Sequence, residues 1–193
     1  MRPPHVDARA LARLAPLLLA LAACSSSEPV VTTPSPAPSP SRQAVQLSVT
    51  SPAFEHEGAI PSRFTCEGEG VSPPLRWDPA PEGTVEWAIL VDDTDAPRGA
   101  FTHWVIFGIP SRATRLEPGV APPGAKQGLN SAGEAAWTGP CPPPGDEPHR
   151  YFFSLLALDA ATGLPDGAAD DDVRKAIQPH VIGHAQIMGT FGR

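Results

Sequence analysis

Hydrophobic and polar residues alternate over several short runs, which is the pattern of half-buried β-strands. The first run places Val45, Leu47 and Val49 on one face and polar residues on the other. Later runs are rich in β-branched and aromatic residues, which favour strands. The pattern predicts strands over residues 45–50, 85–91, 103–109, 150–158 and 185–191.

Segments rich in proline and glycine separate these runs and predict loops. One helix is expected late in the chain, beginning at Asp170, Asp171 and Asp172, because acidic groups stabilise the positive end of the helix dipole. Proline at position 179 should end it. The chain is therefore expected to be mostly β, as an antiparallel β-sandwich or a related closed sheet with a C-terminal helix.

The first 23 residues have the features of a signal peptide. Arg2, Arg9 and Arg13 precede a short apolar run, which is too short to cross a bilayer as a permanent helix. The run stops at Leu-Ala-Ala-Cys, which resembles a bacterial lipobox and predicts that Cys24 is lipidated. The alternative is an ordinary secretory signal in which Cys24 is incidental.

Residues 24–43 are mostly Ser, Thr, Pro and Ala, so they cannot bury enough apolar surface to fold. Their prolines favour an extended conformation, which suits a tether between a membrane and a domain over residues 44–193. We expect an exported lipoprotein at the periplasmic face of the cell envelope or at the cell surface. A disordered tail without an anchor is the alternative.

The charge balance argues against nucleic acid as a partner. The chain has 14 basic and 21 acidic side chains, a net charge of −7. Residues 1–23 hold three of the basic and one of the acidic side chains, so the remainder has 11 and 20, a balance of −9. Such a surface repels nucleic acid and anionic lipid, so any anion site must use local donors.

Two cysteines, Cys66 and Cys141, lie within the expected domain. An even number of cysteines in an oxidising compartment is consistent with a disulfide. Two free buried thiols are the alternative.

Two segments carry candidate chemistry. Residues 92–97 (Asp-Asp-Thr-Asp-Ala-Pro) precede a run that begins with His103, and residues 139–145 (Gly-Pro-Cys-Pro-Pro-Pro-Gly) precede His149. Proline-rich loops hold backbone N–H groups in place, and with histidine such groups can bind an oxyanion. Taken singly, each feature has a structural interpretation, because aspartates before Ala-Pro often form turns and histidines at strand edges are often structural.

The motifs together resemble the bacterial branch of the phosphatidylethanolamine-binding protein family, the Raf kinase inhibitor-like proteins. Besides the two segments, the resemblance includes residues 60–68 (Ile-Pro-Ser-Arg-Phe-Thr-Cys-Glu-Gly), 72–77 (Ser-Pro-Pro-Leu-Arg-Trp) and 189–193 (Gly-Thr-Phe-Gly-Arg). It implies a sandwich of two antiparallel sheets with a small pocket that binds phosphate, acetate or a phospholipid head group. The implied ligand-binding residues are Asp93, Asp95, Pro97, His103, Gly139, Cys141, Pro142, Pro143, His149 and Tyr151.

Chemical roles follow for several of these residues. Asp93 or Asp95 could fix the tautomer of a histidine and hold it cationic, and Tyr151 offers a hydroxyl donor to a phosphate oxygen. The loop before His149 is longer than in the bacterial branch and carries Asp146 and Glu147. These extra carboxylates should weaken anion binding or favour a zwitterion.

The leading hypothesis is a binding protein without enzymatic activity, cofactor or metal, which captures a small anion or head group. An inhibitor or interaction partner of an extracytoplasmic enzyme is the alternative. A phosphoester hydrolase is a third interpretation, but no Ser or Cys nucleophile occupies a recognisable elbow, and a disulfide would remove the thiolate of Cys141. No short metal-binding motif is present.

Overall fold

The computed structural model describes residues 44–193. The signal peptide predicted over residues 1–23, and the lipidated Cys24 and tether predicted over residues 24–43, lie outside the described residues. Within the described part, no helix is both long enough and apolar enough to cross a membrane.

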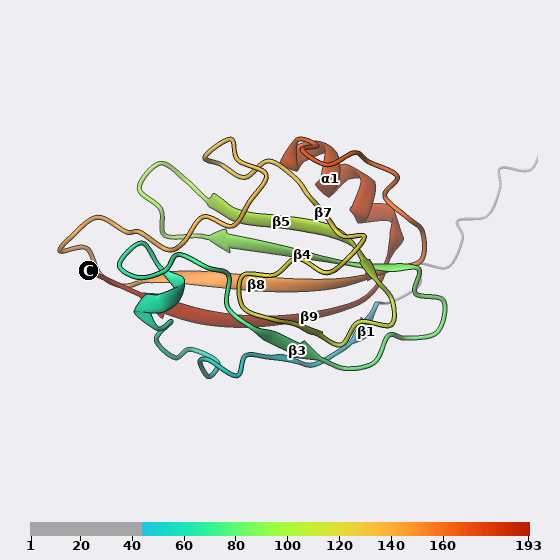
Figure 1. Ribbon diagram of the computed structural model, residues 1–193, viewed down its shortest axis with the longest axis horizontal. Coiled ribbons are helices and arrows are strands. Elements are labelled where there is room, and N and C mark those ends of the chain that lie inside the picture. Colours follow the sequence, from blue (N-terminus) through green and yellow to red (C-terminus); the bar gives the residue numbers. More distant parts are fainter. Residues whose placement is uncertain (1–43) are drawn as a thin grey trace, which may run out of the picture. The chain divides into compact units, whose positions relative to one another are not determined.

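The described residues form two sheets and one α-helix (Figure 1). The strands are β1 (Val45–Gln46), β2 (Val49–Thr50), β3 (Leu75–Trp77), β4 (Glu86–Asp93), β5 (Phe101–Pro110), β6 (Arg115–Leu116), β7 (Lys126–Gln127), β8 (His149–Leu158) and β9 (Val181–Phe191). The helix α1 spans Asp170–Ile177, and short 3₁₀ turns cover Ser62–Phe64 (η1) and Gln178–His180 (η2).

The larger sheet has the order β1-β9-β8-β4-β5-β7, and the smaller has the order β2-β3-β6. The mostly β sandwich with a late helix is therefore confirmed. One pairing departs from the antiparallel expectation, because β1 runs parallel to β9. Strand β1 is the first described strand and β9 is the last, so no hairpin connects them and they can pair in parallel.

The single strand predicted over residues 45–50 is wrong. The chain leaves the larger sheet after β1 and joins the smaller sheet at β2. Between the two strands, the backbone N–H of Leu47 donates to His184, whereas that of Ser48 donates to the Asp78 carboxylate at 2.7 Å. The alternation continues through this crossing, so the sequence pattern alone could not reveal it.

The main core lies between the two sheets. Trp87, Ile89 and Val91 of β4 are fully buried on the inner face, and Leu75 and Trp77 of β3 are buried opposite in the same apolar cluster. Alternate residues of β4 point to the other face of the sheet, as the two-residue period of a strand requires.

Helix α1 covers this other face. Its residues Val173 and Ile177 pack with Ala88 and Leu90 of β4 and with neighbouring apolar groups of β5. As predicted, it begins with three aspartates and ends before Pro179, which lies in η2. The Arg174 guanidinium joins helix to sheet by an ion pair with Asp92 of β4 at 2.7 Å, and it also pairs with Asp170 of its own helix at 2.8 Å.

Strand ends determine where the site forms. The predicted strands at residues 85–91, 103–109 and 150–158 exist, but β4 runs on to Asp93, β5 begins at Phe101 and β8 begins at His149. The last strand begins at Val181 rather than at residue 185. Three strands of two or three residues, β3, β6 and β7, were not predicted, because such short segments show no periodicity.

Candidate ligand-binding pocket

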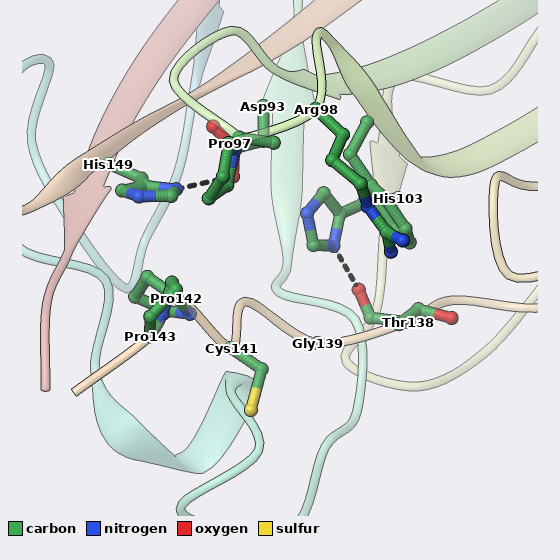
Figure 2. Close-up of a pocket in the computed structure, with 12 residues that line it drawn as sticks. Asp93, Pro97, Arg98, His103, Thr138, Gly139, Cys141, Pro142, Pro143 and His149 are labelled. Atoms are coloured by element: carbon green, nitrogen blue, oxygen red, sulfur yellow. Dashed lines mark hydrogen bonds and ion pairs between the residues drawn. The ribbon is translucent and has the colours of Figure 1, made fainter. Parts of the chain in front are cut away.

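A cavity of about 290 Å³ opens where β4 ends and where β5 and β8 begin (Figure 2). It lies between the loop after β4 and the proline-rich loop before β8. The cavity is lined by Asp93, Ala96, Pro97, Arg98, Phe101, His103, Thr138, Gly139, Cys141, Pro142, Pro143 and His149. Eight of the ten residues proposed from the sequence therefore surround one cavity.

A buried ion pair holds one side of the cavity. The Nδ1 atom of His149 lies 2.8 Å from Oδ2 of Asp93, and both side chains are only 5% exposed. The other carboxylate oxygen of Asp93 accepts a hydrogen bond from the backbone N–H of Asp95 at 2.8 Å. A carboxylate only accepts, so Nδ1 of His149 carries the proton and Nε2 is the nitrogen available to a ligand.

The second histidine lies across the cavity in Figure 2. The register of β4 against β5 shifts between Val91 and Asp92, which pair with Trp104 and Thr102, so His103 has no partner on β4. Such a bulge re-aims a side chain, and bulges are common beside functional sites. The predicted strand continues through this position, but the sequence did not reveal the bulge.

The His103 ring donates from Nδ1 to the backbone carbonyl of Thr138 at 2.7 Å. Because a carbonyl cannot donate, this bond leaves Nε2 of His103 as the second ring nitrogen facing a ligand. Burial lowers the pKa of His103 below its ordinary value, and the Thr138 carbonyl and the Asp93 charge oppose this only in part. His103 is therefore neutral at pH 7, with an acceptor lone pair on Nε2.

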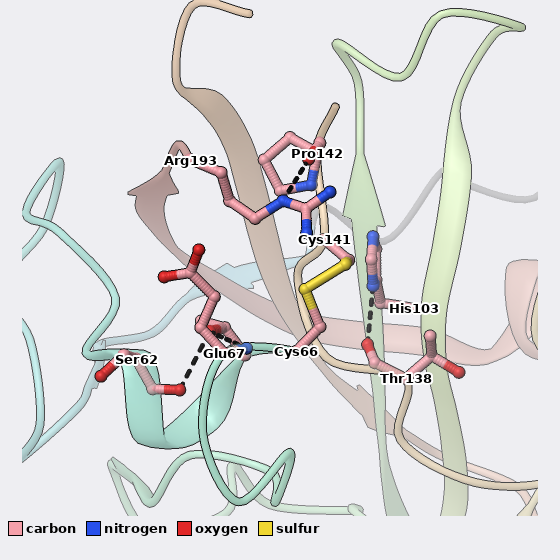
Figure 3. Close-up of a disulfide and its surroundings, with 9 residues drawn as sticks. Ser62, Cys66, Glu67, His103, Thr138, Cys141, Pro142 and Arg193 are labelled. Carbon is pink, nitrogen blue, oxygen red and sulfur yellow. Dashed lines mark hydrogen bonds between the residues drawn. A yellow bond between two sulfur atoms is a disulfide. The ribbon is translucent and has the colours of Figure 1, made fainter. Parts of the chain in front are cut away.

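The proline-rich loop is fixed against η1 and the turn that follows it. The predicted disulfide is confirmed, because Cys66 and Cys141 are bonded and their Cα atoms lie 5.4 Å apart (Figure 3). The N–H of Cys66 also donates to the carbonyl of Pro140 at 3.1 Å. Gly139 lies so close to this turn that a Cβ would lie 3.0 Å from the Thr65 carbonyl carbon, which explains the glycine at this position.

The other side of the loop is held by Arg193. Its Nε donates to the carbonyl of Pro142 at 2.7 Å (Figure 3). Its own carbonyl accepts from the N–H of Gly145 at 3.1 Å. Prolines already restrict the loop, and these bonds hold it at both ends. The cavity is therefore largely preformed.

One cation of the cavity was missed from the sequence. Arg98 lines the cavity and is exposed, and it has no ion-pair partner within residues 44–193. It directly follows Asp-Ala-Pro, so a cation next to the acidic loop was a usable signal. Its guanidinium supplies a local positive charge in an acidic protein.

Two residues proposed for the cavity do not line it. Asp95 turns outward and accepts two hydrogen bonds from the Arg150 side chain, at 2.7 and 2.9 Å. Tyr151 is fully buried in the core, and its ring packs edge-on against His103 with centroids 5.2 Å apart. Its hydroxyl is buried without a hydrogen-bond partner among the described residues, and burial raises its pKa. The proposed donation from Tyr151 to a bound phosphate therefore finds no support in this geometry.

An acidic groove adjoins the cavity and shares His149 with it. Asp95, Asp146, Glu147, Pro148, His149 and Arg150 line this groove. The Asp146 carboxylate lies 3.9 Å from Nε2 of His149. A ligand that reaches from the cavity into this groove would meet carboxylates, which favour a cation at that end. No cluster of three or more His, Cys, Asp or Glu side chains within residues 44–193 is placed to hold a metal ion.

A small, preformed, histidine-lined cavity at the strand ends of a β-sandwich has the features of a small-molecule site. A sequence model described as "Phosphatidylethanolamine-binding protein" matches residues 50–192. The chain belongs to the phosphatidylethanolamine-binding protein family.

Individual relatives agree with this assignment. A "UPF0098 protein" of Methanothermobacter thermautotrophicus is 45% identical over 152 residues, which cover 76% of this chain and 99% of the relative. A Mycobacterium tuberculosis protein named "Putative lipoprotein LppC" is 39% identical over 148 residues, covering 77% and 73% of the two chains. The crystal structure of Escherichia coli YbcL, titled a member of the mammalian family, superposes with a TM-score of 0.72 at 32% identity, covering 76% and 98%.

Proposed function

We propose that this protein binds a small phosphate-bearing ligand, such as phosphoethanolamine or the equivalent lipid head group, and does not turn it over. The observation that carries this proposal is the pair of buried histidines on one cavity. Each uses Nδ1 for an internal hydrogen bond, to Asp93 or to Thr138, which leaves Nε2 for the ligand.

The two histidines suit different parts of a phosphate group. His149 donates from Nδ1 to Asp93, so its Nε2 faces the ligand and donates to a phosphate oxygen whenever the ring carries a second proton. In neutral His103 the Nε2 atom is an acceptor, so it suits a protonated phosphate oxygen. If binding transfers a proton to the ring, Nε2 becomes a donor instead. Arg98 adds a guanidinium, which binds phosphate oxygens strongly.

The acidic groove favours a ligand that also carries an ammonium group. Asp146 is 46% exposed and lies beside Nε2 of His149, so a bare anion at His149 would be repelled by its carboxylate. An ammonium placed in the groove would offset this repulsion. Phosphoethanolamine carries both charges, and it should therefore bind more tightly than inorganic phosphate.

Binding without turnover is supported by the chemistry of the lining. No serine lines the cavity among the described residues, and the sulfur of Cys141 is in the disulfide. A disulfide sulfur is not a thiolate and cannot act as the nucleophile of a hydrolase.

A location at the cell envelope is part of the proposal. It is supported by the lipobox-like Leu-Ala-Ala-Cys sequence and by the relative that is named a lipoprotein. The described domain begins at β1, which pairs with β9 near Gly183, whereas the cavity lies at the end of β9 that pairs with His149.

The direct experiment is an NMR titration of the intact chain, labelled with ¹⁵N, with phosphate and with phosphoethanolamine. We expect saturable shifts centred on His103, His149 and residues 139–145, and tighter binding of phosphoethanolamine. Arg98→Ala should weaken both ligands about 10- to 150-fold, because a hydrogen bond to a charged group contributes about 1.5–3 kcal/mol. Arg112→Ala removes an exposed arginine outside the cavity and serves as the matched control.

The zwitterion preference has its own test. Asp146→Asn should narrow the difference between the two ligands by weakening phosphoethanolamine and strengthening phosphate. Unchanged spectra at millimolar concentrations of both ligands would contradict the binding proposal and would favour a protein partner for this fold. Release of phosphate or ethanolamine during the titration would contradict binding without turnover.

A further inference from the structure

A second cavity of about 230 Å³ lies on another part of the same domain. Its wall is built from the segment before β3, from β5, from the loop between β6 and β7, from β7, and from the segment that leads into the proline-rich loop. The lining residues are Gly70, Val71, Ser72, Trp104, Gly119, Ala121, Gln127, Ala136 and Trp137. It shares no lining residue with the histidine cavity.

Two tryptophans give this cavity flat apolar walls. The rings of Trp104 and Trp137 meet edge to face, with centroids 5.8 Å apart and planes at 81°. The core also holds Trp137 in place, because its ring stacks on that of Phe153 with centroids 6.0 Å apart. Crossed aromatic walls held in this way suit a flat apolar group.

The polar side chains that line this cavity already use their oxygen atoms as hydrogen-bond acceptors. The amide oxygen of Gln127 already accepts from the Trp104 indole at 2.6 Å, which also fixes the orientation of that amide. The hydroxyl oxygen of Ser72 accepts from the N–H of Gly119 at 3.2 Å, and Ser72 is only 3% exposed. Each of these two side-chain oxygens thus already accepts one hydrogen bond.

Donor groups of the lining side chains lack hydrogen-bond acceptors within the described domain. The Trp137 indole N–H is buried and has no acceptor among residues 44–193. Within these residues, the Nε2 group of Gln127 and the hydroxyl proton of Ser72 also have no hydrogen-bond acceptor. A buried donor without an acceptor is rare because it carries a desolvation penalty, so the indole N–H of Trp137, a residue that lines the cavity, points to a missing acceptor.

We propose that this cavity binds a small, flat, uncharged molecule whose carbonyl oxygen accepts from these donors. The lining contains neither a basic nor an acidic side chain. An ion would therefore lose its hydration without gaining a counter-charge, whereas a carbonyl compound with an aromatic or ring-shaped body loses little. This site is separate from the phosphate cavity and does not depend on the function proposed for it.

The four tryptophans of the chain supply a built-in measurement. The indole groups of Trp77, Trp87 and Trp104 donate to Ala113, Ser111 and Gln127, respectively. Only Trp137 has an indole N–H without an acceptor among the described residues. In a ¹⁵N spectrum, the Trp137 indole signal should therefore respond most when an acceptor enters the cavity.

The experiment titrates the intact chain with acetophenone, and with benzoate and benzylamine as charged analogues of similar shape. We expect acetophenone to move the Trp137 indole proton downfield with saturation, while the Trp77 and Trp87 signals stay in place. The charged analogues should bind more weakly. Ser72→Ala should weaken acetophenone about two- to tenfold, as expected for one hydrogen bond, and Ser62→Ala, outside the cavity, should not.

The two cavities must be distinguished, because Trp137 precedes Thr138 and its ring lies 6.3 Å from the His103 ring. His103→Ala should leave the acetophenone response in place. Three results would each overturn the proposal: no Trp137 shift at saturating acetophenone, equal binding of benzylamine, or loss of the response in His103→Ala. The comparison of ligands on the unmodified chain decides the matter even if a variant fails to fold.

Discussion

His149 of β8 and Asp93 of β4 form a buried ion pair at 2.8 Å, with each side chain 5% exposed. The pair joins the ends of two neighbouring strands at the mouth of the cavity and decides which nitrogen of His149 meets a ligand. Burial makes this pair important, because the Asp93 carboxylate alone would be a charge without compensation in a site with little water.

Replacement of the buried partner should therefore cost stability. Asp93→Asn keeps the size of the side chain but removes its charge, and we expect a loss of about 1–3 kcal/mol in the free energy of unfolding. Asp146→Asn is the matched control, because Asp146 is more exposed and lies 3.9 Å from the other nitrogen of the same ring, so its effect should stay below about 1 kcal/mol. Urea denaturation measures both, and equal losses would refute the special role of Asp93.

Anion binding should strengthen as the pH falls. In the free protein, burial lowers the pKa of His103, so the ring is neutral near pH 7. A bound anion stabilises the protonated ring and raises the pKa of His103, so proton uptake accompanies binding. The affinity for the anion therefore rises as the pH falls from the pKa of the bound state to the pKa of the free state. Calorimetry with sulfate, which stays dianionic over this range, should show tighter binding at pH 5.5 than at pH 7.5. His103→Gln should flatten the dependence, and a slope that persists in this variant would assign it to another group.

The carboxyl group of Asp95 should titrate unusually low. Hydrogen bonds from the Arg150 side chain lower its pKa from 3.8 to about 2. The stabilisation it provides is therefore present above pH 3.8 and is lost as the pH falls towards 2. Carboxyl ¹³C NMR should return the pKa of Asp95 towards 3.8 in Arg150→Ala and leave it near 2 in Arg115→Ala, whose arginine pairs with Glu117. An unshifted Asp95 in the unmodified chain would contradict the ion pair.

Loss of the disulfide should destabilise the domain. Cys66 and Cys141 are 75 residues apart, so the bond closes a long loop and restricts the unfolded chain. The double replacement by serine should cost about 2–5 kcal/mol by urea denaturation. Phosphoethanolamine should also bind more weakly, because the proline-rich loop loses one of its anchors. A reducing agent should reproduce both effects in the unmodified chain and change nothing in the double variant.

Much of the fold followed from sequence pattern. The runs that form β4, β5, β8 and β9 are long, apolar and rich in β-branched or aromatic residues, and helix α1 begins with aspartates and stops before a proline. These signals are local, so they can be found without knowledge of the neighbours. Strands β3, β6 and β7 were missed because two or three residues owe their conformation to the strand they pair with.

The same distinction applies to the site. The sequence by itself determined which segments carry histidine, aspartate, proline and cysteine, and their order limited the candidates for the cavity to a few residues. Tertiary structure alone decided that Asp93 rather than Asp95 meets His149, that a bulge frees His103, and that Tyr151 turns into the core. Those outcomes depend on strand register and on which side chains compete for one space, and no local pattern records either.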